Sequence, residues 1–122
     1  MDFLEKFKKL EGYIASAIVD ASGEVIFQDA GVLADKNIDE ALLTFNSLFT
    51  KTSEIADDLG FGGANLASIE TEKAIILIKC SGRDARVHLH IVLVLEKEGG
   101  NIGLAKLTMN QVMQEVIKSL GI

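Results

Sequence analysis

The side chains best suited to metal chemistry are two histidines and the single cysteine. His88 and His90 lie two residues apart in the segment VHLHIVLVL. Alternate residues of a strand point to one face, so the two imidazoles could bind one ion, with Cys80 as the obvious third ligand. The sequence has no HxxxH or CxxC pair and no acidic partner at ligand spacing. His88 and His90 are therefore weak metal candidates, and the simpler alternative is hydrogen bonding beneath a helix.

A second cluster lies in AIVDASGEVIF, where Asp20, Ser22 and Glu24 fall within five residues. No histidine or lysine is near Ser22 in sequence to act as a base and activate its hydroxyl. Asp suits the first position of a type I turn, because its carboxylate accepts a hydrogen bond from the N–H two residues on. Gly23 then supplies the left-handed conformation that closes a short hairpin with a bulge. The cluster predicts a turn and not a reactive site.

Two glycine-rich segments could be mistaken for phosphate loops. GFGG, at residues 60–63, leaves a predicted helix and opens a strand, which is the reverse of the phosphate-loop order. GGNIG, at residues 99–103, precedes a helix but lacks the Lys-Ser/Thr pair that holds nucleotide and magnesium. No set of residues joins a nucleophile, a base and an oxyanion donor. We therefore expect a protein that binds, with no active site of its own and no cofactor.

The composition indicates one domain with more apolar surface than its own core requires. The chain has 122 residues and a mean hydropathy of +0.29. With glycine counted and tyrosine left out, about 56% of residues are apolar, against roughly 45–50% in typical soluble domains. No apolar run approaches the ~20 residues of a membrane span, so membrane insertion is not expected. The excess predicts a surface buried against a partner.

Charge and cysteine content narrow the function classes further. The net charge is −6, which makes the chain a poor nucleic-acid binder. The start, MDFLEKFKKL, has no signal-peptide pattern, and one cysteine excludes an internal disulfide framework. We expect a cytoplasmic protein.

The periodicity predicts an α+β domain over residues 1–122, in the order α-β-β-α-β-β-β-α, with a five-stranded antiparallel sheet and helices on both faces. We expect helices over residues 3–10 (with Asp2 as N-cap), 38–59 and 102–120, and strands over residues 13–19, 24–28, 64–70, 73–80 and 87–95. The strand over residues 87–95 is apolar on both faces toward its end, which predicts a central, doubly covered position.

The helix over residues 38–59 is the least ordinary element. Asn37 and Glu40 form a variant of the capping box, and Gly60 stands at the C′ position. At roughly 33 Å the helix is longer than a short strand can cover. Its apolar stripe comprises Ile38, Ala41, Leu42, Phe45, Leu48, Phe49, Ile55, Ala56 and Leu59. Either this stripe packs entirely within the domain, or part of it remains for a partner.

The last helix has a predicted buried face made of Ile102, Ala105, Met109, Val112, Met113, Val116, Ile117 and Leu120. Leu104 and Leu107 fall off that face and are candidates for contact with a partner. Arg83 and Arg86 lie in or beside a predicted hairpin turn with Asp84, and either could reach a partner's carboxylate or phosphate. A solvated turn is the alternative for both arginines.

The segment LEGYIASAIVDASGEVIF resembles the opening of roadblock / dynein-light-chain domains, and IVLVLEKEGGNIGLAKL resembles the ending of their bacterial and archaeal members. The order of elements is also similar over nearly the whole chain. The resemblance implies a profilin-like fold and a homodimer in which the third strands pair edge to edge and the long helices pack together. It places the dimer interface at Phe45, Leu48, Phe49, Thr52, Asn65, Leu66, Ala67, Ser68, Ile69 and Glu70.

Members of that family bind and regulate small Ras-like GTPases or serve as scaffolds, and the resemblance transfers no catalytic residue. Two other functions are open. A PAS-like sensing domain would have a small-molecule or metal pocket between sheet and helices, with His88, His90 or Cys80 inside. A structural adaptor would serve a larger complex without any GTPase.

Overall fold

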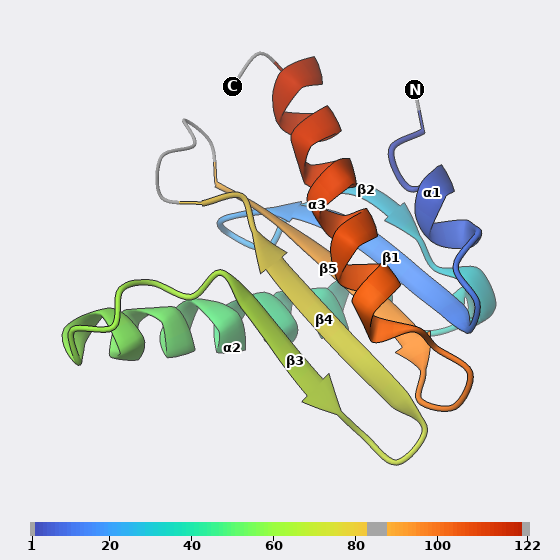
Figure 1. The fold of residues 1–122 in the computed structure, drawn as a ribbon, viewed down its shortest axis with the longest axis horizontal. Helices are drawn as coiled ribbons and strands as arrows, with labels where there is room; N and C mark the ends of the chain where they lie inside the picture. The colour runs from blue at the N-terminus through green and yellow to red at the C-terminus, as the bar shows by residue number, and fades with distance from the viewer. Residues whose placement is uncertain (1, 83–87, 121–122) are drawn as a thin grey trace.

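The computed structural model describes residues 2–82 and 88–120, and Figure 1 shows their arrangement. The elements are α1 (Glu5–Lys8), β1 (Tyr13–Asp20), β2 (Val25–Asp29), the 3-10 helix η1 (Gly31–Leu33), α2 (Ile38–Asp58), β3 (Leu66–Glu70), β4 (Ala74–Cys80), β5 (Leu89–Glu96) and α3 (Ile102–Ser119). Within this described part, no helix is long and apolar enough to cross a bilayer.

The five strands form one antiparallel sheet in the order β2-β1-β5-β4-β3. β5 therefore lies at the centre, between β1 and β4, and its residues from Leu89 to Leu93 are all buried. This confirms the doubly covered position that its continuous apolar run predicts. β2 and β3 are the two edge strands.

The helices make a layer on each face of the sheet, and Figure 1 shows α3 and α1 on the near face and α2 on the far face. On the near side, Phe7, Met109 and Val112 pack against Ile91 and other strand residues of the larger core. On the far side, Leu42 and Phe49 pack on a smaller core. Alternate residues of each strand supply the two cores, as the period of two requires.

The predicted inward face of α3 is largely confirmed. Ala105, Met109, Val112, Met113 and Val116 are buried, and Ile102 and Ile117 are partly buried against the same core. Leu104 and Leu107 are 48% and 54% exposed, as their place off the stripe predicts. Leu120 is 46% exposed, so its assignment to the buried face was wrong. It follows the last helical residue, Ser119, where it serves as the C-cap.

The DASG segment is a turn held by one carboxylate. Asp20 Oδ1 accepts hydrogen bonds from the N–H groups of Ser22 (2.9 Å) and Glu24 (3.0 Å) and from the Ser22 hydroxyl (2.6 Å). The Ser22 hydroxyl is the largest cause of the lowered pKa of Asp20, and the backbone N–H groups add to it. Gly23 has a φ of 89°, and a bulge follows, because Ile18 faces Phe27 while Val19 faces Val25. The turn prediction is confirmed.

The first helix is shorter than predicted. α1 is a single turn, and Leu4, not Asp2, occupies its N-cap position. The Asp2 carboxylate accepts a hydrogen bond from the Leu4 N–H at 3.0 Å, just before the helix begins. The chain then turns into β1 through Gly12, whose φ is 79°. Phe3, Leu4 and Phe7 are all buried. Phe3 and Leu4 reach the core from a turn before the helix, so their spacing resembled that of a longer helix.

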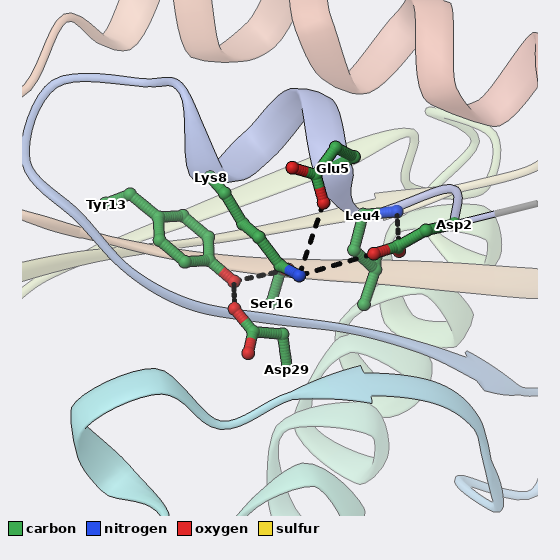
Figure 2. Close-up of polar contacts among 7 residues, drawn as sticks. All are labelled: Asp2, Leu4, Glu5, Lys8, Tyr13, Ser16 and Asp29. Atoms are coloured by element: carbon green, nitrogen blue, oxygen red, sulfur yellow. Dashed lines mark hydrogen bonds and ion pairs between the residues drawn. The ribbon is translucent and has the colours of Figure 1, made fainter.

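A small polar network ties the start of β1 to the end of β2. Figure 2 shows the Tyr13 hydroxyl directed at Asp29, to which it donates a hydrogen bond of 2.5 Å, with Ser16 Oγ at 2.8 Å. Burial, followed by the hydrogen bond to the Asp29 carboxylate, raises the pKa of Tyr13 above its ordinary value. The phenol therefore stays protonated and acts as a structural donor.

Candidate functional site

The outer edge of β3 is one half of the candidate site. β3 pairs with β4 through residues 66–70, and within the described residues nothing pairs with its other side. Its side chains alternate: Ala67 and Ile69 are partly buried in the α2-side core, while Leu66, Ser68 and Glu70 are exposed. An unprotected edge of this kind is a template for a further strand.

The apolar surface of α2 is the other half. Only three of its 21 residues are buried, namely Leu42, Asn46 and Phe49, whereas α3 buries six of 18. Leu48, Ile55 and Leu59 are 50%, 60% and 65% exposed. Together with Thr52 they follow the i, i+4, i+7, i+11 spacing of one helical stripe, here called the exposed stripe. An apolar stripe that the protomer leaves in solvent indicates a partner surface.

The single stripe expected for this helix is therefore divided in two. Phe49 is 3% exposed and lies in the core, and Phe45 and Ile38 are partly buried against it. Phe49 consequently supports the position of α2 and has almost no surface left for a second copy. The division is first angular, because Leu48 and Phe49 are neighbours about 100° apart around the helix, and only Phe49 faces the sheet. It is reinforced toward the end of α2, where the C-terminal half of the helix projects beyond β3, as Figure 1 shows.

Local signals at both ends fix the length of α2. At the N-cap, Asn37 Oδ1 accepts a hydrogen bond from the Glu40 N–H (3.3 Å), and Asn37 Nδ2 donates to the Glu40 carboxylate (3.1 Å). At the other end, the N–H of Gly60 donates to Asp57 O (3.0 Å) and that of Phe61 donates to Ala56 O (2.9 Å). This is a Schellman-type cap around Gly60, whose φ is 86°. Phe61, which follows Gly60 at this cap, is 81% exposed.

An apolar cavity of about 280 Å³ lies between the N-terminal half of α2 and the sheet. Ile38, Leu42 and Phe45 contribute from the helix, and Val92 and Val94 contribute from β5. Small side chains account for the space, because the remaining wall includes Ala15, Ser16, Ala17, Ala41, Thr71 and Ala74.

A polar cleft of about 280 Å³ lies farther along α2, between its C-terminal half and the sheet. Cys80, His88 and His90 line it from the sheet, and Glu54 and Asp57 line it from the helix. Cys80 Sγ lies 3.9 Å from His88 Nδ1, so the structure brings the predicted metal candidates to one face. Across residues 2–82 and 88–120, however, no three His, Cys, Asp or Glu side chains are grouped so that they could hold a metal ion.

His90 is engaged within the fold. Its Nδ1 forms a hydrogen bond with Asn46 Oδ1, and its ring packs on Phe49 with the ring centres 4.9 Å apart. The Asn46 amide also donates to Ala21 O at 3.1 Å, in the β1–β2 turn. Asn46 was missed at the sequence level, although a polar residue inside an apolar helical stripe was the available signal. The pair fastens the middle of α2 to the sheet.

The buried His90 predicts a loss of stability in acid. Burial, with His88 nearby as a smaller cause, lowers the pKa of His90 below its ordinary value of 6.5. The folded state therefore binds a proton less readily than the unfolded chain, so the contribution is fully present above pH ~6.5 and is lost as the pH falls through the folded pKa. We expect the free energy of unfolding, measured by urea titration between pH 7.5 and 5, to fall more steeply in the wild type than in His90→Gln.

The exposed neighbour provides a comparison variant. His88→Gln removes only the smaller of the two causes, so it is expected to leave most of the wild-type pH dependence in place. An equally steep fall in His90→Gln and in the wild type would show that other groups carry the pH response.

The remaining candidates lie apart from this surface. Leu104 and Leu107 are on α3, across the sheet from α2, so they do not belong to the same site. Arg83 and Arg86 lie outside the described residues. Asn65, just before β3, is exposed and lines the polar cleft.

No protein-family model and no curated protein matches the sequence. Solved structures do match, and they define the class: a Roadblock/LC7 domain from Streptomyces avermitilis superimposes with a TM-score of 0.83 at 12% identity, covering 100% of this chain and 98% of that one. The chain is thus a roadblock-type domain in its fold, and the predicted α+β architecture is confirmed.

Two particular structures extend the comparison. Myxococcus xanthus MglB matches with a TM-score of 0.80 at 13% identity, over 98% of this chain and 89% of that chain. A structure described as MglB with a tetrameric arrangement matches with a TM-score of 0.79 at 19% identity, over 95% and 83%. At these identities the likeness establishes the fold.

Proposed function

We propose that this chain is a homodimeric, non-catalytic binding module that docks a small Ras-like GTPase in the cytoplasm. The observation that carries the proposal is the combination of an unpaired β3 edge with the exposed stripe of α2. The strand edge has backbone N–H and C=O groups that a further strand can pair with. The helix has apolar side chains that a partner can remove from water.

A second copy fits both requirements at once. Antiparallel pairing of β3 with the β3 of a second copy would join two sheets into one and remove the edge from each. The part of α2 that projects beyond β3 would then lie above the partner's sheet, and the two exposed stripes would face each other. The proposed interface comprises Phe45, Leu48, Thr52, Asn65, Leu66, Ala67, Ser68, Ile69 and Glu70, with Ile55 and Leu59 added by their exposure.

A GTPase is the partner favoured by the fold. The roadblock resemblance in the sequence implies regulation of small Ras-like GTPases, and MglB structures share this fold over most of both chains. The paired α2 helices would form a broad platform on one face of the joined sheet. Leu104 and Leu107 lie on the other face of the sheet, so they are candidates for a separate contact with a partner. Arg83 and Arg86, which lie outside the described residues, stay candidates from the sequence.

The test uses purified small Ras-like GTPases from the same organism, beginning with any that is encoded beside this chain, each loaded with GDP or with a non-hydrolysable GTP analogue. We expect binding, measured by titration calorimetry, to be about tenfold or more tighter for one nucleotide state, because a regulator must distinguish the two states. The GTP hydrolysis rate, compared with and without this chain, separates an activating role from scaffolding. Equal absence of binding in both states would reject the GTPase proposal and favour a structural adaptor.

A second function has one specific observation behind it. The polar cleft contains Cys80, His88 and His90, as a PAS-like sensing domain would require. A small molecule or metal carried through purification, detected by mass spectrometry of the native protein, would support this function.

A further inference from the structure

We propose that the apolar cavity beneath the N-terminal half of α2 receives Leu59 and Phe61 of a second copy of this chain. The inference rests on the proposed homodimer and adds to it a specific socket and its occupant. In such a dimer, each protomer would fill the space between α2 and the sheet of the other protomer.

The proposed occupant is a rigid apolar end. Phe61 is 81% exposed and Leu59 is 65% exposed. Backbone hydrogen bonds fix both to the last turn of α2, from Leu59 N–H to Ile55 O (3.0 Å) and from Phe61 N–H to Ala56 O (2.9 Å). Leu59 and Phe61 cannot reach the cavity of their own protomer, because it lies under the opposite end of a helix about 32 Å long. Any burial of these two side chains must therefore involve another molecule.

The proposed socket has suitable size and chemistry. Its volume of 280 Å³ exceeds the roughly 150 Å³ that suffices to hold a benzene molecule, so a phenylalanine ring fits. Its walls are almost entirely apolar. Four of the lining residues, namely Ala15, Ala17, Ala41 and Ala74, have side chains too small to fill the space. Thr71 and Ala74, at the turn between β3 and β4, form the wall nearest the free edge.

Symmetry brings the two together. The Ala64 N–H donates to Ser53 Oγ (2.8 Å), which ties the C-terminal half of α2 to the segment just before β3. The helix end projects outward from there, as Figure 1 shows. In the proposed dimer a two-fold axis lies between the two antiparallel β3 strands, so the α2 helix of the partner points in the opposite direction. The axis therefore places the partner's helix end past the last residues of β3, beside the wall made by Thr71 and Ala74, and the contact occurs twice.

Cross-linking tests this contact between chains. In a Cys80→Ser background, Phe61→Cys is placed on one chain and Thr71→Cys on a second chain that carries a mass tag. Mixing and exchange are done at a chain concentration about 100-fold or more above the wild-type dissociation constant, which offsets the weakening expected from loss of the Phe61 ring. A short bismaleimide is then expected to join the two different chains in high yield. Leu107→Cys replaces Phe61→Cys as the matched control, since Leu107 is exposed on the other side of the sheet, and it is expected not to cross-link to position 71.

A double-mutant cycle provides the second measurement. Phe61→Ala removes the occupant and Ala41→Leu fills the socket, and each is expected to weaken dimerisation about 30-fold, as a hot-spot side chain does. Because both remove the same contact, their combination should weaken it little further. Val32→Ala, at a 79% exposed site in η1, serves as the neutral control.

The outcomes separate this inference from the proposed function. A dimer that shows neither the 61–71 cross-link nor coupling between the two substitutions would overturn the socket and leave the dimer intact. A wild-type chain that sediments as a monomer would overturn both.

Discussion

Leu48→Glu combined with Ile55→Glu is expected to convert the proposed dimer into a monomer. The two side chains are 50% and 60% exposed in the protomer, so glutamates there remain hydrated and the fold is retained. In the dimer both would lie against the partner helix, where an unpaired charge costs several kcal/mol. Two such charges on each chain should raise the dimer dissociation constant by more than about 1,000-fold.

Sedimentation equilibrium over a concentration series measures this change. The control is Leu107→Glu, which places the same charge at a 54% exposed leucine on the opposite side of the sheet, and it should dimerise as the wild type does. A double variant that retains the wild-type dissociation constant would remove the exposed stripe from the interface and with it the basis of the proposed function.

Phe49→Ala is expected to have the largest effect on protomer stability, lowering the free energy of unfolding by about 3–5 kcal/mol. Phe49 is 3% exposed and is one of only three buried residues that hold α2 on the sheet. Its loss would leave a cavity beside His90, against which its ring packs. The cost is a large part of the roughly 5–15 kcal/mol that stabilises a typical domain.

Urea unfolding followed by circular dichroism tests this value. The measurement belongs in the Leu48→Glu/Ile55→Glu background, so that dimerisation does not add to the apparent stability. Phe61→Ala, at an 81% exposed phenylalanine, is the matched control and should change protomer stability by no more than about 0.5 kcal/mol. A cost for Phe49→Ala as small as that of the control would show that α2 is held by other contacts.

The parts of the fold that local interactions decide could be read from the sequence. The Asn37–Glu40 cap and the Gly60 cap depend on residues within one turn of the helix end, so the limits of α2 were predicted to within one residue. The turn at Asp20 and the central place of β5 were likewise predictable, because each depends on neighbouring residues or on one apolar run.

The candidate site was only partly predictable, because it depends on distances between elements. The sequence indicated an apolar stripe on α2 but could not divide it, since the division depends on which side of the helix faces the sheet and on where the sheet ends beneath it. The Asn46–His90 bond joins residues 44 positions apart, beyond the reach of periodicity. The apolar cavity arises from small residues on four separate segments that only the folded chain brings together.

The β-bulge in β2, where it pairs with β1, makes the outer edge of β2 less regular than the outer edge of β3. A flat edge on both sides of a sheet would allow copies to add without limit, and the product would be a filament. Val25 and Phe27 face consecutive residues of β1, so Ile26 is an extra residue that bends and twists this short strand away from regular pairing. Strand addition would therefore stop after two copies have paired through β3. The proposed assembly would stay a dimer and would not grow into a filament, even at high protein concentration.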